Sequence, residues 1–219
     1  MIKACIFDLD GTVLDTIASI THFVNVAMDK YSIRRISIEE CKIFVGCGAR
    51  VLIEKTLASR GVDPSLVPEV LDYYNGEYNK NISYLVSPFS GIPELLASLR
   101  ARGILVGVVS NKPDFITRPL AQKMLPGLVD MAFGGREGIP LKPDPQAPLE
   151  VLAEFGVSPS ECAFIGDTGV DMQTGKNLGA AITVGVSWGF RSRSELSENG
   201  ADAIVDHPSE IFPLVASDD

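Results

Sequence analysis

Asp8 and Asp10 stand directly after a short apolar run near the start of the chain. This run, residues 2–7, has the nearly continuous hydrophobicity of a strand that is buried on both faces of a parallel sheet. Side chains alternate along an extended segment, so the two carboxylates point the same way where the strand ends, and Gly11 permits a sharp turn. Two like charges at one strand end are costly unless a cation joins them. The pair therefore predicts a metal-assisted acid site.

An Asp-x-Asp-Gly string also occurs in calcium-binding loops and in plain surface turns. The calcium loop requires glycine at its sixth position and glutamate at its twelfth, where this chain, counted from Asp8, has Val13 and Ser19. The calcium-loop interpretation is therefore excluded. For the motif taken alone, a plain strand-end turn stays open.

Polar residues follow apolar runs, or lie before a helix, in three other parts of the chain. These parts are Ser110-Asn111-Lys112, Leu141-Lys142-Pro143-Asp144-Pro145 and Gly166-Asp167-Thr168-Gly169-Val170-Asp171. Each alone has an ordinary explanation: Ser110 as a helix cap, Lys142 as a solvated lysine and Asp167 as a strand-end carboxylate. Because the strand ends of an open α/β sheet meet at one edge, where ligands bind, the loops together predict a single site.

The elements that must position these residues alternate regularly from residue 93 onward. We expect strands at 104–109, 131–133, 163–165, 181–186 and 203–205, and helices at 93–102, 113–124, 145–155 and 169–178. Together with the first strand, this alternation predicts an α/β fold with a doubly wound parallel sheet.

A long helical stretch separates the first strand from this alternating part. Its segments at about 16–31, 37–46, 49–60 and 64–80 have helical spacing or lack strand alternation. Such a stretch is too long for a simple crossover between strands. We therefore expect an all-α cap domain at residues 15–88, inserted into a core domain formed by residues 1–14 and 89–219.

The composition is that of an ordinary globular protein, with 46% hydrophobic residues, 21% charged residues and a formal net charge of −9. We see no basic stripe and expect no nucleic-acid partner. Cys5, Cys41, Cys47 and Cys162 have neither metal-ligand spacing nor the density of a disulfide scaffold. No charged leader precedes the first strand and no apolar run reaches the length of a membrane span, so we expect a cytoplasmic protein without membrane contact. A monomer and a homodimer both fit the sequence.

As an ordered set, these motifs resemble those of the haloacid dehalogenase (HAD) superfamily. The resemblance rests on Asp8-Leu9-Asp10-Gly11-Thr12, Ser110, Lys142, and Gly166-Asp167 with Asp171, and it extends along nearly the whole chain. Within the superfamily the chain is similar to the phosphoglycolate phosphatase-like branch with a helical cap. That similarity includes Pro88-Phe89-Ser90-Gly91, Lys142-Pro143-Asp144-Pro145, Trp188-Gly189-Phe190-Arg191-Ser192 and Gly200-Ala201-Asp202. It implies a Rossmann-like core and a phosphatase.

The resemblance also implies a Mg²⁺-dependent route through an aspartyl-phosphate. Asp8 would attack phosphorus in line, and Asp10 would protonate the departing ester oxygen and later take a proton from the hydrolytic water. Asp8, Asp167 and the backbone carbonyl of Asp10 would bind Mg²⁺. Asp171 would bind the ion directly or hold another of its ligands.

The remaining motif residues would handle the charge of the phosphoryl group. Ser110 and the backbone amides around Leu9 and Asn111 would hold its oxygens. Lys142 would offset the negative charge that the nucleophile shares with phosphate. Thr12, which we also place among the phosphate-binding residues, favours hydrolysis, because related sugar-phosphate mutases often carry valine there.

The expected cap contributes further candidates. Arg50, at the end of Gly46-Cys47-Gly48-Ala49-Arg50, could clamp a substrate carboxylate or a second phosphate, or could simply decorate its helix. His22 could face the site or be a partly exposed structural histidine. Cys47 has no assigned role.

These inferences favour a Mg²⁺-dependent phosphatase of a small phosphomonoester, with 2-phosphoglycolate as the first choice. Inorganic pyrophosphatase, sugar-phosphate phosphatase and phosphoglucomutase stay open, because cap residues decide among them. A haloacid dehalogenase would lack Asp10, and a phosphonatase would need a Schiff-base lysine in the cap, for which Lys42 and Lys55 qualify by position alone. A receiver-like signalling module is disfavoured, because its acidic pair is contiguous and it has no long helical insertion. No glycine-rich dinucleotide or P-loop motif follows any strand.

Overall fold

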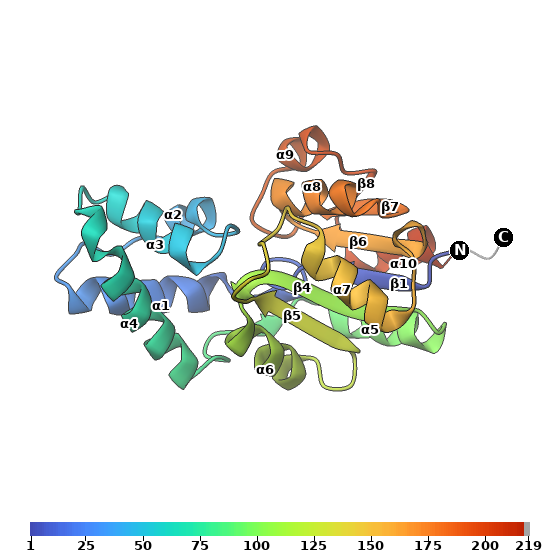
Figure 1. Cartoon of the computed structure of the whole chain (residues 1–219), viewed down its shortest axis with the longest axis horizontal. Helices are drawn as coiled ribbons and strands as arrows, with labels where there is room; N and C mark the ends of the chain where they lie inside the picture. The colour runs from blue at the N-terminus through green and yellow to red at the C-terminus, as the bar shows by residue number, and fades with distance from the viewer. Residues whose placement is uncertain (217–219) are drawn as a thin grey trace.

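A computed structural model describes residues 1–216 of the chain, and six strands of that part form one sheet (Figure 1). The strands are β1 (Ala4–Phe7), β4 (Leu105–Pro113), β5 (Met131–Gly135), β6 (Cys162–Gly166), β7 (Ile182–Val186) and β8 (Ala203–Val205). Their order is β5-β4-β1-β6-β7-β8, and every neighbouring pair is parallel. The predicted doubly wound parallel sheet is therefore confirmed. The chain winds outward on both sides of β1, so the ligand crevice of such a sheet lies at the carboxyl end of β1.

Helices cover both faces of this sheet. One face carries α7 (Gln146–Phe155) and α8 (Gly169–Leu178), and the other carries α5 (Ile92–Ala101), α6 (Asp114–Met124) and α10 (Ile211–Val215). In β1, Ala4 and Ile6 pack toward α7, whereas Cys5 and Phe7 belong to the larger core on the opposite face. All of β1 is buried, which is why its sequence is continuously apolar rather than alternating.

The predicted helical insertion consists of α1 (Ile17–Lys30), α2 (Ile38–Phe44), α3 (Ala49–Ala58), the short helix η1 (Pro64–Leu66) and α4 (Val67–Lys80). These helices lie beyond the carboxyl edge of the sheet, at the end of the molecule away from the N-terminus (Figure 1). The chain leaves and re-enters the core through a two-stranded antiparallel ladder of β2 (Leu14–Asp15) and β3 (Ser87–Pro88). We propose that residues 15–88 act as one cap domain and residues 1–14 and 89–219 as the core, of which 217–219 lie outside the described residues.

Several elements differ from the sequence prediction. Strand β4 runs four residues past its predicted end at Val109, because the chain pairs with β5 again at Pro113, after an irregularity in register. Ser110, Asn111 and Lys112 therefore belong to an extended strand end. The ladder at the cap entrance, α9 (Arg193–Glu198), α10, η2 (Pro159–Glu161) and η3 (Pro208–Glu210) were not predicted, because such short elements carry too little periodicity.

At Gly175 in α8 the fold leaves no room for a side chain. A Cβ atom there would lie 2.5 Å from Oγ1 of Thr183 and 3.1 Å from Cβ of Phe164. The glycine thus lets α8 approach β6 and β7 closely and brings the first turn of this helix to the sheet edge. Among the described residues, no helix has both the length and the apolar character needed to cross a membrane.

Candidate active site

Asp8 is the first residue after β1, and the backbone fixes its position. Its amide donates to the carbonyl of Ile165 at 2.9 Å, and its side chain is almost completely buried. The carbonyl of Leu9 then accepts bonds from the amides of Val13 at 3.1 Å and Leu14 at 2.9 Å, closing a tight loop. Gly11 has a φ of 87°, and a Cβ there would lie 2.4 Å from Oδ2 of Asp167. The turn therefore requires glycine both for its backbone angle and for space.

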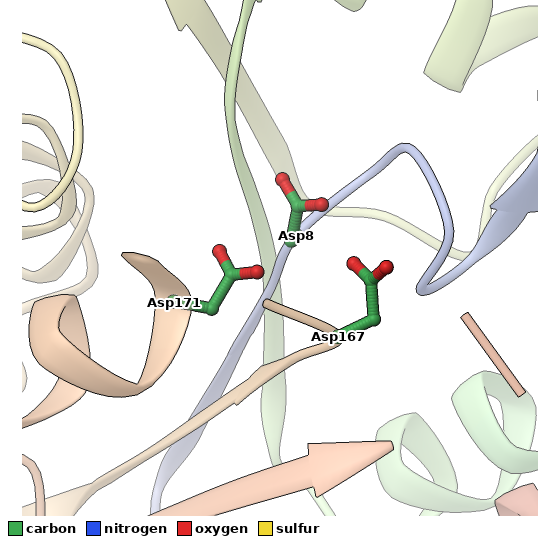
Figure 2. Close-up of side chains that lie close together, drawn as sticks. All are labelled: Asp8, Asp167 and Asp171. Carbon is green, nitrogen blue, oxygen red and sulfur yellow. The ribbon is translucent and has the colours of Figure 1, made fainter. Parts of the chain in front are cut away.

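Asp8, Asp167 and Asp171 form an acidic cluster at the carboxyl ends of β1 and β6. One carboxylate oxygen from each residue lies within 4.8 Å of the other two. Figure 2 shows these carboxylates reaching into the same space from three segments: the end of β1, the end of β6 and the first turn of α8. All three residues are buried.

Burial and mutual repulsion make this cluster unfavourable without a cation. Burial raises the pKa of Asp8 to about 7. The positive charge of Lys142 lowers this pKa, and the negative charge of Asp171 raises it further. Burial, followed by the charges of Asp171 and Asp8, raises the pKa of Asp167 well above its ordinary value. Hard divalent cations prefer carboxylate oxygens. The donor set therefore fits a divalent metal ion, which would offset the repulsion.

Lys142 joins two members of the cluster. Its Nζ lies 2.5 Å from Oδ1 of Asp8 and 2.7 Å from Oδ1 of Asp171. Burial alone would lower the pKa of this lysine, but the two carboxylates raise it above its ordinary value. The Asn111 side chain holds the lysine loop, accepting from the Lys142 amide at 2.8 Å and donating to its carbonyl at 3.2 Å.

Further donors orient the two carboxylates that follow β6. Asp167 accepts from Oγ1 of Thr12 at 3.1 Å and from the amide of Phe190 at 2.8 Å. Oδ2 of Asp171 accepts from the amide of Thr168 at 3.0 Å and from its hydroxyl at 2.6 Å, in a capping box that begins α8. These bonds fix both side chains in one orientation toward Asp8.

Asp10 lies apart from the acidic cluster and has its own cation. The Nζ of Lys112 is 3.2 Å from both carboxylate oxygens of Asp10. It also lies 4.5 Å from the centre of the Tyr78 ring, which belongs to α4 of the cap. Both Asp10 and Lys112 line the same pocket as Asp8.

This pocket lies between the core and the cap. Its core side is mainly polar, with Asp8, Asp10, Ser110, Asn111, Lys112, Lys142, Thr168 and Asp171 beside the apolar Pro113, Ile116 and Phe190. Its cap side is mainly apolar, with Ile20, Val45, Gly46, Gly48, Ala49, Leu52 and Tyr74. The arrangement can hold a small anionic group against the strand ends while the cap covers the rest of the molecule.

Comparison with known proteins agrees with this geometry. The sequence model of the haloacid dehalogenase-like hydrolases matches residues 5–184, a span that contains the acidic cluster, Asp10, Lys112 and Lys142. The chain belongs to the haloacid dehalogenase-like hydrolase family. The resemblance predicted from the sequence motifs is thereby confirmed.

Several related phosphatases match this chain over nearly their whole length. The N-acetylmuramic acid 6-phosphate phosphatase of Pseudomonas aeruginosa is 28% identical over 98% of this chain and 95% of its own. The phosphoglycolate phosphatase of Thiobacillus denitrificans is 29% identical over 98% of this chain and 96% of its own. The crystal structure of a candidate phosphoglycolate phosphatase from Lactobacillus delbrueckii subsp. bulgaricus matches with a TM-score of 0.93, at 32% identity, over 99% of both chains.

The structure brings most of the predicted core residues of this HAD site together. Asp8, Asp10, Ser110, Asn111 and Lys142 all line the pocket. The carboxylates of Asp167 and Asp171 join Asp8, whereas the side chain of Asp10 points to Lys112 instead. The expected metal contact of Asp10 was through its backbone carbonyl, and that contact stays a prediction.

Leu9 and Thr12, expected to bind phosphate, lie in the loop behind the pocket. The side chain of Leu9 is fully buried in the core, so only its backbone is available for the role assigned to it. Thr12 is also fully buried, and its hydroxyl is bonded to Asp167. In this structure Thr12 orients a metal-binding candidate and does not face the pocket.

The structure does not bring the predicted cap candidates to the pocket wall. The Arg50 side chain is 58% exposed and pairs with Glu54 one turn along α3 at 3.6 Å. His22 packs its ring against Phe23 and Tyr84, with ring centres 5.0 Å and 4.7 Å apart. Cys47 is a half-buried free thiol. The cap wall is built instead from apolar side chains and the backbone of the loop that precedes α3.

Lys112 is a charged pocket residue to which the sequence analysis gave no role. A lysine just after an apolar run usually lies in solvent, but this side chain is only 5% exposed. A signal was present in the sequence. Lys112 directly follows Ser110 and Asn111, which were both assigned to the site.

Proposed function

We propose that this HAD hydrolase is a Mg²⁺-dependent phosphatase that hydrolyses a small phosphomonoester through an aspartyl-phosphate on Asp8. The main support is the position of Asp8 at the carboxyl end of the central strand β1. Lys142 contacts one of its oxygens, and two further carboxylates lie beside it. The family and the phosphatase relatives support the same reaction class.

In the first step the carboxylate of Asp8 attacks phosphorus, forming an O–P bond as the bond to the ester oxygen breaks. The Asp10 carboxyl gives its proton to the departing oxygen, and the alcohol leaves. In the second step Asp10 takes a proton from a water molecule, which attacks phosphorus and releases phosphate from Asp8. Lys142 and Ser110 hold the negative charge of the phosphoryl oxygens throughout.

Asp8, Asp167, Asp171 and the backbone carbonyl of Asp10 would hold the Mg²⁺ ion. When bound, the ion would neutralise part of the negative charge on the phosphoryl oxygens and on the carboxylates around it. Thr12 and the Phe190 amide keep the Asp167 carboxylate turned toward this position.

We propose 2-phosphoglycolate as the first substrate to test, and N-acetylmuramic acid 6-phosphate as the second. Phosphatases of both compounds are relatives over nearly the full chain. The apolar cap wall and the outward direction of Arg50 favour a second candidate class, esters whose leaving group is a neutral sugar. Among the described residues no cap cation lines the pocket, and this disfavours pyrophosphate most, because its leaving group carries more negative charge than the single carboxylate of 2-phosphoglycolate.

The test is phosphate release from these four substrate classes with Mg²⁺ and with chelator. We expect Mg²⁺-dependent release in the wild type and a loss of about a thousandfold or more in Asp8→Asn, because no covalent intermediate can form. Wild-type activity in Asp8→Asn, or turnover by the wild type in the presence of chelator, would contradict the proposal. Conversion of a sugar phosphate into its positional isomer without release of phosphate would instead identify a mutase.

We also propose that the protein works in the cytoplasm as a monomer or homodimer. The support for the compartment is its set of free thiols, Cys5, Cys41, Cys47 and Cys162, of which three are buried.

A further inference from the structure

We propose that Lys112 of the core and Tyr78 of the cap together position the Asp10 carboxyl, so that closing the cap completes the acid–base group of the reaction. This inference rests on the proposed function, because Asp10 is the residue that would protonate the leaving oxygen. Lys112 and Tyr78 are positioning residues that act through Asp10.

Lys112 has the geometry of a support for Asp10. Its Nζ is equidistant, at 3.2 Å, from both carboxylate oxygens, so it restrains the rotation of the whole carboxyl group. The backbone of Lys112 is also fixed by two hydrogen bonds. Its amide donates to Oγ of Ser110 at 3.2 Å, and its carbonyl accepts from Oγ1 of Thr117 at 3.1 Å.

Tyr78 supplies the other half of the support from the cap. Its ring centre lies 4.5 Å from the Lys112 ammonium, within the range of a cation–π contact, and the tyrosine is fully buried. The ring is itself held inside the cap. Its hydroxyl accepts from Oγ of Ser19 at 3.2 Å, and its centre lies 4.6 Å from that of Phe23 in α1. Tyr78 therefore moves with the cap and not with the core.

The two buried lysines of the pocket serve different aspartates. Lys142 is bonded to Asp8 and Asp171, whereas Lys112 contacts Asp10. Burial alone would lower the pKa of Lys112, but the charge of Asp10 and the contact with Tyr78 raise it above its ordinary value. The ammonium is thus a permanent cation, and its position rather than its protonation is what the cap controls.

Opening of the cap would withdraw the Tyr78 ring from Lys112 and let water solvate the ammonium. Asp10 would then lose its fixed orientation, while Asp8 and Lys142, both on the core, would keep theirs. An ester that reaches Asp8 in the open protein would find the nucleophile ready but the proton donor out of place. The chemistry of esters with poor leaving groups would accordingly wait for closure.

The dependence on the leaving group tests this inference. The wild type, Lys112→Met and Tyr78→Leu would be compared by kcat/KM, which reports the step that releases the leaving group. One substrate is the alkyl phosphate that the wild type hydrolyses best, and the other is acetyl phosphate, whose leaving group needs no proton. For the alkyl ester we expect a loss of about a hundredfold in Lys112→Met and about tenfold in Tyr78→Leu. For acetyl phosphate we expect a loss of less than about threefold, because no general acid is required.

Matched variants separate positioning from general damage. Tyr78→Phe keeps the aromatic face but loses the hydroxyl that accepts from Ser19 and contributes to the contact with Lys112, so its loss of kcat/KM on the alkyl ester should be smaller than that of Tyr78→Leu. The double variant Lys112→Met with Tyr78→Leu should be no worse than Lys112→Met alone, because the tyrosine acts through the lysine. If Lys112→Met fails to fold, Tyr78→Leu and Tyr78→Phe still decide the question.

An equal loss on the alkyl ester and on acetyl phosphate, or no loss on the alkyl ester in either Lys112→Met or Tyr78→Leu, would overturn the inference. Failure of the proposed function has a different signature: a wild type that cleaves neither substrate, or an Asp8→Asn variant that keeps activity.

Discussion

The charges of the site residues do not balance within the protein. Asp8, Asp10, Asp167 and Asp171 would carry four negative charges when ionised, against two positive charges on Lys112 and Lys142. The difference, 4 − 2 = 2 negative charges, equals the charge of one divalent cation. Because the cluster of three carboxylates holds this surplus, it is also where the cation belongs.

At the residue scale, Thr12 supports a first prediction about metal binding. Thr12→Val should weaken Mg²⁺ binding by about tenfold to a hundredfold, because Asp167 loses the hydroxyl that orients one of its oxygens. Titration calorimetry with Mg²⁺ measures this directly and needs no substrate. Thr12→Ser, which keeps the hydroxyl, should bind Mg²⁺ within about threefold of the wild type. Equal affinities of the valine variant and the wild type would show that the hydroxyl does not serve the metal site.

At the scale of elements, the loop between β7 and α9 connects the metal-binding candidates to the cap. Trp188 donates from Nε1 to the carbonyl of Thr12 at 3.0 Å, and the Phe190 amide holds Asp167. One residue later, the Arg191 guanidinium donates to the carbonyl of Val45 at 2.7 Å and to that of Lys42. These carbonyls belong to the end of α2, where a helix leaves its last acceptors unpaired. A cation at this end is also favoured by the helix dipole.

Arg191 should therefore stabilise the closed position of the cap. Bonds to a charged group contribute about 1.5–3 kcal/mol, so Arg191→Met should reduce the closed population relative to the open one by about tenfold or more. Hydrogen exchange of the amides at residues 43–48 should become faster, and KM should rise.

Arg193→Met is the matched control for this prediction. It removes the same charge two residues away, from a half-exposed side chain that pairs with Asp206 within the core. Its exchange in the cap should equal that of the wild type. Equal exchange in the Arg191 variant as well would mean that the other contacts hold the cap without it.

Within the cap, the lowered pKa of Glu40 should make the stability of the protein depend on pH. Hydrogen bonds from Arg60 and from the Ser37 amide lower the pKa of Glu40 from 4.5 to about 2. A carboxyl whose pKa is lower in the folded state stabilises the fold above its ordinary pKa and loses this contribution as the pH falls toward 2. The urea midpoint of the wild type should therefore exceed that of Glu40→Gln at pH 7, and the difference should shrink at pH 3.

Glu39→Gln serves as the comparison, because Glu39 lies on the same helix with a side chain that is 79% exposed. Its midpoint should follow that of the wild type at both pH values. A difference between Glu40→Gln and the wild type that is as large at pH 3 as at pH 7 would assign the effect to packing rather than to charge.

At the scale of the whole molecule, the sequence predicted those parts of the fold whose hydrophobic residues follow a regular pattern. The apolar run of β1 and the alternation after residue 93 were enough for the doubly wound sheet, and the ordered motifs were enough for the family. Contacts between segments that are distant in the chain could not be predicted from the sequence. The pairing of Lys112 with Tyr78 and that of Arg191 with α2 depend on how the cap sits on the core, which no local pattern records. Arg50 was chosen by its position in the chain, but the turn of α3 directs it to Glu54.

The acidic cluster should make the whole protein less stable than its fold permits until a cation binds. Buried like charges repel, so Asp167→Asn should raise the midpoint of thermal unfolding in chelator by a few degrees, about 1 kcal/mol for a chain of this size. Mg²⁺ should raise the midpoint of the wild type, because it binds the folded state alone, and should leave that of Asp167→Asn nearly unchanged. Calorimetric scans of both proteins with and without Mg²⁺ make the comparison. A variant that unfolds earlier than the wild type in chelator would show that the bonds from Thr12 and Phe190 to Asp167 outweigh the repulsion.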